Sequence, residues 1–309
     1  MLARLQQFIT LGLLVISAVW AGWCWRAGYA GWALAGSALI VFGYALVLAI
    51  EFVLLSRVNR FDSAPAASAR QLLRAWWGEV CAAPSVFCWR QPFRSRRWPD
   101  HLPADAPGRR GVVLIHGFFC NRGIWNPWLA RLHNAGVPYV AVNLEPIFGS
   151  IDHYADIVEA AVHRIERATG MAPVLVGHSM GGLALRRWWA DAAEPDRVHH
   201  AITIGTPHRG TWLARFAFSH NGRQMHLTSE WHRTLGSREA AGRAAGFTCY
   251  YSHCDNIVFP ASNATLPGAD NRHLAAVAHV HMVDRPEPYA ELLCWLELPK
   301  GPLQDTLNI

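Results

Sequence analysis

The chain has 309 residues, enough for one complete catalytic domain and an accessory segment. Its apolar fraction of 52%, with only 16% charged residues, is high for a wholly soluble protein, and the net charge of +6 comes almost entirely from arginine because Lys300 is the only lysine. Seven cysteines without CxxC or zinc-ligand spacing argue against a disulfide framework and fit the reduced thiols of a cytosol-facing domain.

Two uncharged hydrophobic segments, residues 8–25 and 27–50, open the chain. Each is long enough to cross a hydrocarbon core as a helix, which takes roughly 20 residues. Aromatic side chains gather around Arg26 between them, as at a membrane interface. We therefore expect a two-helix transmembrane anchor over residues 1–56. Cleavage of the first segment as a signal peptide, or burial of both in a soluble core, are the alternatives.

Residues 57–107 are rich in arginine and tryptophan and form the expected juxtamembrane linker. Within it, residues 67–82 predict an amphipathic helix that either lies in the membrane surface or packs on the catalytic domain. Its apolar face carries Leu72, Leu73, Trp76, Trp77 and Val80.

Positive charge flanks the cytoplasmic ends of membrane helices. Arg4 precedes the first hydrophobic segment, and a series of arginines begins at Arg57 after the second. This bias predicts both termini on the cytoplasmic side of a bacterial inner membrane, with the catalytic domain on that face. The arginine run contains no recognisable nucleic-acid-binding module, so membrane lipids rather than nucleic acid are the expected partner.

From residue 108 onward, short apolar runs alternate with helical patterns, which predicts a mainly parallel sheet covered by helices. The expected catalytic domain covers residues 108–300 and is followed by a tail over 301–309. Strands are expected at 111–115, 137–144, 173–176, 200–204, 247–252 and 274–278, and helices at 124–134, 151–169, 180–190 and 286–296.

The sequence Gly177-His178-Ser179-Met180-Gly181 has the pattern G-x-S-x-G. The apolar run 174–176 leads directly into it, and a predicted helix follows. A sharp strand-to-helix turn needs small residues on both sides to lift the serine oxygen out, and the helix N-terminus favours developing negative charge. This context predicts that Ser179 is a nucleophile.

Acyl transfer by a serine needs two backbone N–H groups directed at the oxyanion. We expect one from Met180, directly after the nucleophile. The second is expected from Phe118, in the sequence His116-Gly117-Phe118 that ends the 111–115 strand. His116 is assigned no proton-transfer role.

The acid and the base are expected after the nucleophile in the chain. Asp255 follows the 247–252 strand and is favoured over Asp270 as the acid that orients a histidine. His279 follows the last expected strand and is favoured as the base over its neighbours His273 and His281.

Over residues 108–298, the chain resembles the bacterial triacylglycerol lipase/esterase family of the α/β-hydrolase superfamily. The resemblance implies the α/β-hydrolase fold, Ser179 as nucleophile, Asp255 as acid and His279 as base, and Phe118 and Met180 as oxyanion donors. Ala278 departs from the glycine usual before the histidine, and residues 206–246, where the family keeps a lid, are too few for a large cap. The matching segments are HGFFCNRGIW (116–125), VGHSMGGLALR (176–186), IGTPHRGTWLA (204–214), GRQM (222–225), CDNIVFP (254–260), LPGAD (266–270) and AHVHMVDRP (278–286).

We therefore expect a membrane-anchored serine hydrolase that cleaves carboxylic esters, of lipid acyl type, through an acyl-enzyme. No cofactor is needed, and no HExxH or other metal-ligand spacing occurs. An acyltransferase or thioesterase with the same three residues, and a catalytically silent membrane scaffold, are the alternatives. The sequence leaves the oligomeric state open.

Overall fold

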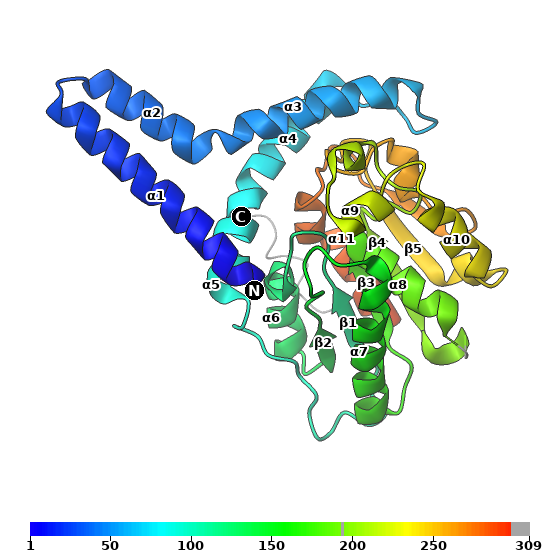
Figure 1. Ribbon diagram of the computed structural model, residues 1–309. Coiled ribbons are helices and arrows are strands. Elements are labelled where there is room, and N and C mark those ends of the chain that lie inside the picture. Colours follow the sequence, from blue (N-terminus) through cyan, green and yellow to red (C-terminus); the bar gives the residue numbers. More distant parts are fainter. Residues whose placement is uncertain (193–194, 298–309) are drawn as a thin grey trace.

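The computed structural model describes residues 1–192 and 195–297. The expected tail over 301–309 and the last residues of the expected catalytic domain lie outside this part of the chain. An arm of helices projects from an α/β body, and the chain enters the body through α4 (Figure 1).

The body is built on one six-stranded sheet in the order β2-β1-β3-β4-β5-β6, and all its neighbouring strands are parallel. β1 lies between β2 and β3, with Val112 opposite both Tyr139 and Val174. The expected mainly parallel sheet is confirmed. The strands are β1 (Val112–Ile115), β2 (Tyr139–Ala141), β3 (Val174–His178), β4 (His200–Ile204), β5 (Phe247–Tyr251) and β6 (Asp270–His273).

Helices cover both faces of this sheet. Alternate residues of β1 enter different apolar clusters, Val112 and Leu114 on one face and Val113 and Ile115 on the other. The first face packs against α6 (Asn126–Asn134) and α11 (Pro286–Trp295), and the second against α7 (Tyr154–Thr169) and α8 (Met180–Asp191). Strands buried on both faces explain the continuous apolar runs in the sequence.

The expected strand at 274–278 is wrong. The edge strand is β6, whose side chains are largely exposed, and the apolar residues after it belong to a loop. Val277 and Ala278 are buried in that loop, and the positive φ of 55° at Ala276 breaks the extended backbone. Hydrophobicity therefore marked a buried loop instead of the exposed edge.

Short helices complete the body. Residues 206–246, which were expected to be too few for a large cap, form η6 (Trp212–Phe216), α9 (His220–Gln224), α10 (Glu230–Arg238) and η7 (Arg243–Gly246). The other short helices of the body are η3 (Arg122–Trp125), η4 (Ile151–His153), η5 (Pro195–Arg197), η8 (Ala261–Ala264) and η9 (His281–Asp284).

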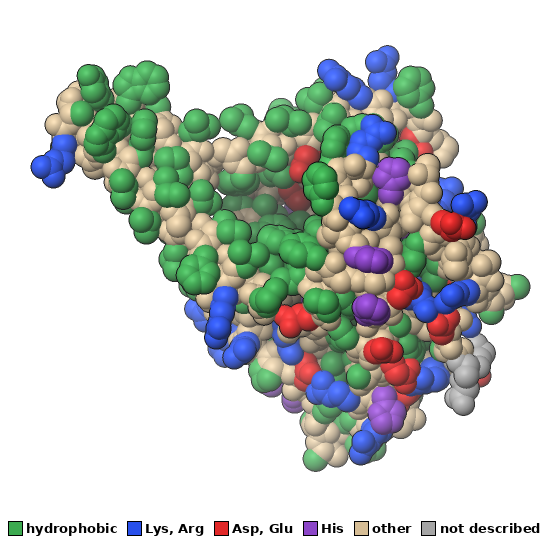
Figure 2. All heavy atoms as spheres, in the orientation of Figure 1, with side chains coloured by type: hydrophobic (Ala, Val, Ile, Leu, Met, Phe, Trp, Pro, Cys, Tyr) green, Lys and Arg blue, Asp and Glu red, His purple; other side chains and the backbone are tan. Residues whose placement is uncertain are grey.

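The arm consists of α1 (Leu2–Arg26), α2 (Ala30–Phe42) and α3 (Tyr44–Val58). α1 is long and apolar enough to cross a membrane by itself, whereas α2 and the helix after it pass the same test only as one span bent by 53° at Gly43. The indole nitrogen of Trp20 donates to the carbonyl oxygen of Trp32, which ties α1 to α2. Apolar side chains gather over the arm and charged ones over the body, as Figure 2 shows.

The expected amphipathic helix is α4 (Ala69–Pro84), which begins with a capping box between Ser68 and Gln71. It packs against the body through one face that buries Glu79, while Leu73 and Trp77 remain exposed. η1 (Asn59–Phe61) precedes it, and the π-helix η2 (Ser85–Arg90) and α5 (Gln91–Arg94) continue it. The packing on the catalytic body is thus observed, with two large apolar side chains left free.

Candidate active site

Ser179 lies at the turn between β3 and α8, with φ 54° and ψ −128°. Its backbone N–H donates to the carbonyl oxygen of Ile204 at 2.8 Å, which fixes the turn to β4. A Cβ at Gly177 would lie 2.6 Å from the backbone of Gly182, and one at Gly181 only 2.6 Å from the carbonyl oxygen of His116. The strained serine conformation is therefore held by neighbours that only glycine allows.

Asp255 and His279 form a buried pair. The Nδ1 atom of His279 lies 2.9 Å from Oδ2 of Asp255, and the other carboxylate oxygen accepts the backbone N–H groups of Ile257 at 2.9 Å and Val258 at 2.8 Å. Neither side chain is more than 5% exposed. A carboxylate held in this way keeps the proton of the imidazole on Nδ1 and leaves Nε2 as the acceptor.

The charges around His279 favour its protonated form. Burial by itself lowers the pKa of His279, but the charge and hydrogen bond of Asp255, together with the charges of Glu79 and Glu51, outweigh burial and raise that pKa above its ordinary value. An imidazole in this setting accepts a proton readily.

His279 lies close to the carboxyl end of β3, against residues that adjoin Ser179 and β4. Its ring lies against that of His178, the residue before Ser179, with ring centres 4.7 Å apart. A Cβ at Gly205, which follows β4, would lie 3.0 Å from Oδ2 of Asp255 and 3.1 Å from Nδ1 of His279. The structure thus brings Asp255 and His279 to the same edge of the sheet as Ser179.

The residues considered as alternatives lie elsewhere. Asp270 is exposed on β6 and pairs with Arg272 at 2.8 Å. His273 packs against His253 with ring centres 4.4 Å apart. His281 faces α4, because a Cβ at Gly78 would overlap its ring. None of these three is hydrogen bonded to the Asp255–His279 pair in the described residues.

The two expected oxyanion donors belong to segments that adjoin Ser179. Met180 is the first residue of α8, so its N–H is one that the helix leaves unpaired. Phe118 follows Gly117, whose Cβ would lie 2.7 Å from that of Ser179. The loop after β1 therefore lies directly against the serine.

His116 has a structural position. Its Nε2 atom accepts the backbone N–H of Leu144 at 3.0 Å, so Nδ1 carries the proton and lies 2.9 Å from the carbonyl oxygen of Gly117. Burial lowers the pKa of His116 to about 4, so the ring stays neutral and ties β1 to the loop after β2.

Sequence reasoning missed two polar residues beside these loops. The side-chain oxygen of Gln91 accepts the backbone N–H of Asn121 at 2.9 Å, close to the Phe118 loop. Glu79 accepts the backbone N–H groups of Val280 and His281, next to His279. The available signal for Glu79 was that it is the only acid in the predicted helix 67–82.

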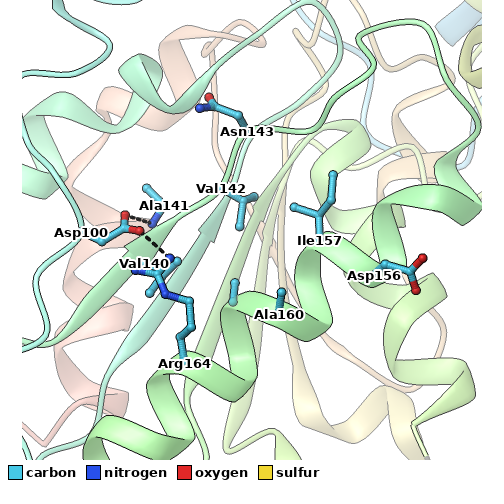
Figure 3. Close-up of a pocket in the computed structure, with 10 residues that line it drawn as sticks. Asp100, Val140, Ala141, Val142, Asn143, Asp156, Ile157, Ala160 and Arg164 are labelled. Carbon is cyan, nitrogen blue, oxygen red and sulfur yellow. Dashed lines mark hydrogen bonds and ion pairs between the residues drawn. The ribbon is translucent and has the colours of Figure 1, made fainter.

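A cavity of about 430 Å³ lies away from Ser179, between β2 and α7 (Figure 3). Asp100 and Arg164 form an ion pair of 2.7 Å across it, and Asp100 also accepts the backbone N–H of Ala141. Asp100 and Arg164 thus neutralise each other, and none of the expected site residues lines the cavity. Among the described residues, no group of three or more His, Cys, Asp or Glu side chains is arranged to hold a metal ion.

Comparison with known proteins finds a match to the family model of the alpha/beta hydrolase fold over residues 111–268. A triacylglycerol lipase of Burkholderia plantarii is 36% identical over 130 residues, which cover 38% of this chain and 36% of that lipase. A triacylglycerol lipase of Pseudarthrobacter phenanthrenivorans is 36% identical over 121 residues, which cover 36% of this chain and 37% of that lipase. The match thus spans little more than a third of these curated relatives.

Among solved structures, the mature form of the Bacillus licheniformis lipase BlEst2 superposes with a TM-score of 0.55 at 17% identity. The superposition covers 63% of this chain and 95% of that one. At this level of identity the similarity establishes the shared fold of the body.

Proposed function

Since the chain belongs to the alpha/beta hydrolase fold family, we propose that it is a serine hydrolase of carboxylic esters in which Ser179 is the nucleophile, His279 the base and Asp255 the acid. The observation that carries this proposal is the buried hydrogen bond of 2.9 Å between His279 and Asp255, beside a serine in a strained strand-to-helix turn. That arrangement supplies a base of fixed tautomer next to a nucleophile.

The reaction takes two steps. The hydroxyl oxygen of Ser179 attacks the ester carbonyl carbon while its proton passes to Nε2 of His279, and the N–H groups of Phe118 and Met180 donate to the oxyanion. The imidazolium of His279 then protonates the departing alkoxide, leaving an acyl-serine and a free alcohol. Water, deprotonated by His279, hydrolyses the acyl-serine and releases the carboxylic acid.

We propose lipid acyl esters as the substrate class. Phe118, on the loop against Ser179, packs with Phe119 and with Phe148, which is 48% exposed. Phe216 and Phe218 of the 206–246 segment are exposed as well. Several exposed apolar side chains in one region favour contact with a lipid substrate over exposure to water. The two curated relatives are named triacylglycerol lipases, which agrees with this substrate class.

We further propose that the arm anchors the enzyme in a bacterial inner membrane, with the body on the cytoplasmic face. Exposed apolar side chains along α1, such as Phe8, Val15 and Val19, support contact with lipid. The arginines beginning at Arg57 support the orientation. An alkaline phosphatase fused after Arg110 should be inactive and a fluorescent protein bright. An active phosphatase fusion would place the body in the periplasm.

The function is tested with the full chain in detergent and in vesicles, using nitrophenyl esters from acetate to palmitate and phospholipids. We expect ester hydrolysis by the wild type and none above background by Ser179→Ala. A Ser179→Ala protein that retains more than a few per cent of the activity would rule out the proposed nucleophile. Addition of a competing alcohol separates hydrolysis from acyl transfer, because an acyltransferase forms the new ester in preference to the free acid.

A further inference from the structure

α4, which was expected either to lie in the membrane surface or to pack on the catalytic domain, contacts the loop that carries His279. The approach is close at Gly78, where any Cβ would overlap the ring of His281. Arg90 of η2 adds a two-pronged ion pair to Asp284, at 2.8 and 3.0 Å. The N-terminal part of the chain is therefore packed directly against the candidate site.

Glu79, the residue after Gly78, is 2% exposed. Its two carboxylate oxygens accept the backbone N–H groups of Val280 and His281, each at 3.0 Å. These N–H groups lie at the N-terminus of η9, where a short helix leaves its donors unpaired. One buried carboxylate thus fixes the two peptide groups that directly follow His279.

A second helix of the N-terminal part reaches the same loop. Glu51 of α3 accepts a hydrogen bond from Nδ2 of Asn256 at 2.6 Å, and Oδ1 of Asn256 accepts the backbone N–H of His279 at 3.2 Å. The N–H groups of three successive residues, 279–281, are thus held by side chains that belong to, or are bonded to, α3 and α4.

The charges that face His279 come from Asp255, Glu79 and Glu51. His178 contributes none, because burial and then the charge of His279 hold the pKa of its ring well below the ordinary value. Burial also raises the pKa of Glu79 to about 7, against the two backbone hydrogen bonds that lower it. Its negative charge therefore develops near neutral pH, where an imidazole base works.

We propose that Glu79 is a positioning residue for His279: it fixes the loop of the base and its charge favours the imidazolium formed during acyl transfer. The proposal rests on the proposed role of His279. It makes the N-terminal part of the chain a component of the active site as well as a tether.

The test uses the full chain with Glu79→Gln, which keeps the size of the side chain but removes its charge and one acceptor. Removal of a negative charge lowers the pKa of His279, so the acidic limb of the kcat/KM profile should move to lower pH by roughly 0.5 to 1 unit. We expect kcat to fall about tenfold or more, with KM within about twofold. Asp284→Asn is the matched control, because it loosens the same loop without removing a charge that faces His279.

An unmoved acidic limb in Glu79→Gln, or an equal shift in Asp284→Asn, would overturn the proposal. If Glu79→Gln does not fold, Glu79→Asp provides the test. Its shorter carboxylate should leave the acidic limb of the kcat/KM profile in place and lower kcat. A kcat equal to that of the wild type would overturn the proposal. Failure of the proposed function looks different, because the wild type itself would then hydrolyse no ester.

Discussion

Replacement of Asp255 by asparagine changes the site by one atom and its hydrogens. Oδ1 accepts two backbone N–H groups, so the amide oxygen must take this place and the amide nitrogen must face Nδ1 of His279. An amide N–H cannot accept a hydrogen bond from Nδ1–H. The imidazole therefore shifts its proton to Nε2, where it can no longer act as a base.

The wrong tautomer should lower kcat by about 10⁴, which corresponds to about 5 kcal/mol of transition-state stabilisation. KM should change little, because the substituted group does not touch the substrate. The assay is the hydrolysis of a short nitrophenyl ester by the full chain, with thermal unfolding as the check on folding.

Asp270→Asn is the matched control. The side chain of Asp270 is exposed, and within the described residues its ion-pair partner is Arg272. Its kcat should stay within about twofold of the wild type. An Asp255→Asn protein that keeps more than a tenth of its kcat, or an Asp270→Asn protein that loses it, would refute the assignment of the acid.

Three further outcomes are expected from the same assay. His279→Ala should lower kcat by about 10⁴ to 10⁶ and His281→Ala by less than tenfold, since its ring faces α4; the reverse order would reassign the base. Gly205→Ala puts a methyl group 3.0 Å from Oδ2 of Asp255 at a φ of 56°. We therefore expect kcat to drop and the protein to lose roughly 1 to 2 kcal/mol of stability. An unchanged kcat and melting temperature would contradict the close packing of Gly205 against the Asp255–His279 pair. Because its neighbours raise the pKa of His279, kcat/KM should fall as pH drops through a value above the ~6.5 of a free imidazole; a midpoint below that value argues against the charge environment.

The sheet and the residues proposed for catalysis were predictable because their signals are local in the chain. The strand-to-helix turn at Ser179 is recognisable in the sequence because an apolar strand, flanking glycines and the start of a helix occur within a few residues. Asp255 and His279 follow strands or apolar runs, and the carboxyl ends of parallel strands meet at one edge of the sheet. Short-range patterns therefore single out residues that folding brings to one edge of the sheet.

The edge strand was not predictable in this way. Residues 270–273 are polar and largely exposed, so they lack the apolar pattern of a strand, while residues 274–278 show it because they are buried as a loop. Burial and strand formation coincide in the centre of a parallel sheet and separate at its edge.

The break at Gly43 and the contacts of Glu79 could not be predicted from the sequence, for a different reason. Residues 27–50 form one uncharged run, and composition alone does not locate a bend of 53° within it. Glu79 bonds backbone groups 201 and 202 residues away. Backbone donors carry no side-chain signature, so the partner of a buried carboxylate remains invisible until the chain is folded.

The most direct measurement of the central claim is covalent labelling of the full chain with a fluorophosphonate, followed by peptide mapping with mass spectrometry. A serine activated by His279 and Asp255 should carry the phosphonyl group on the peptide that contains Ser179, and Ser179→Ala should remain unlabelled. Labelling that persists in Ser179→Ala, or an adduct on another residue of an esterase-active preparation, would contradict the account.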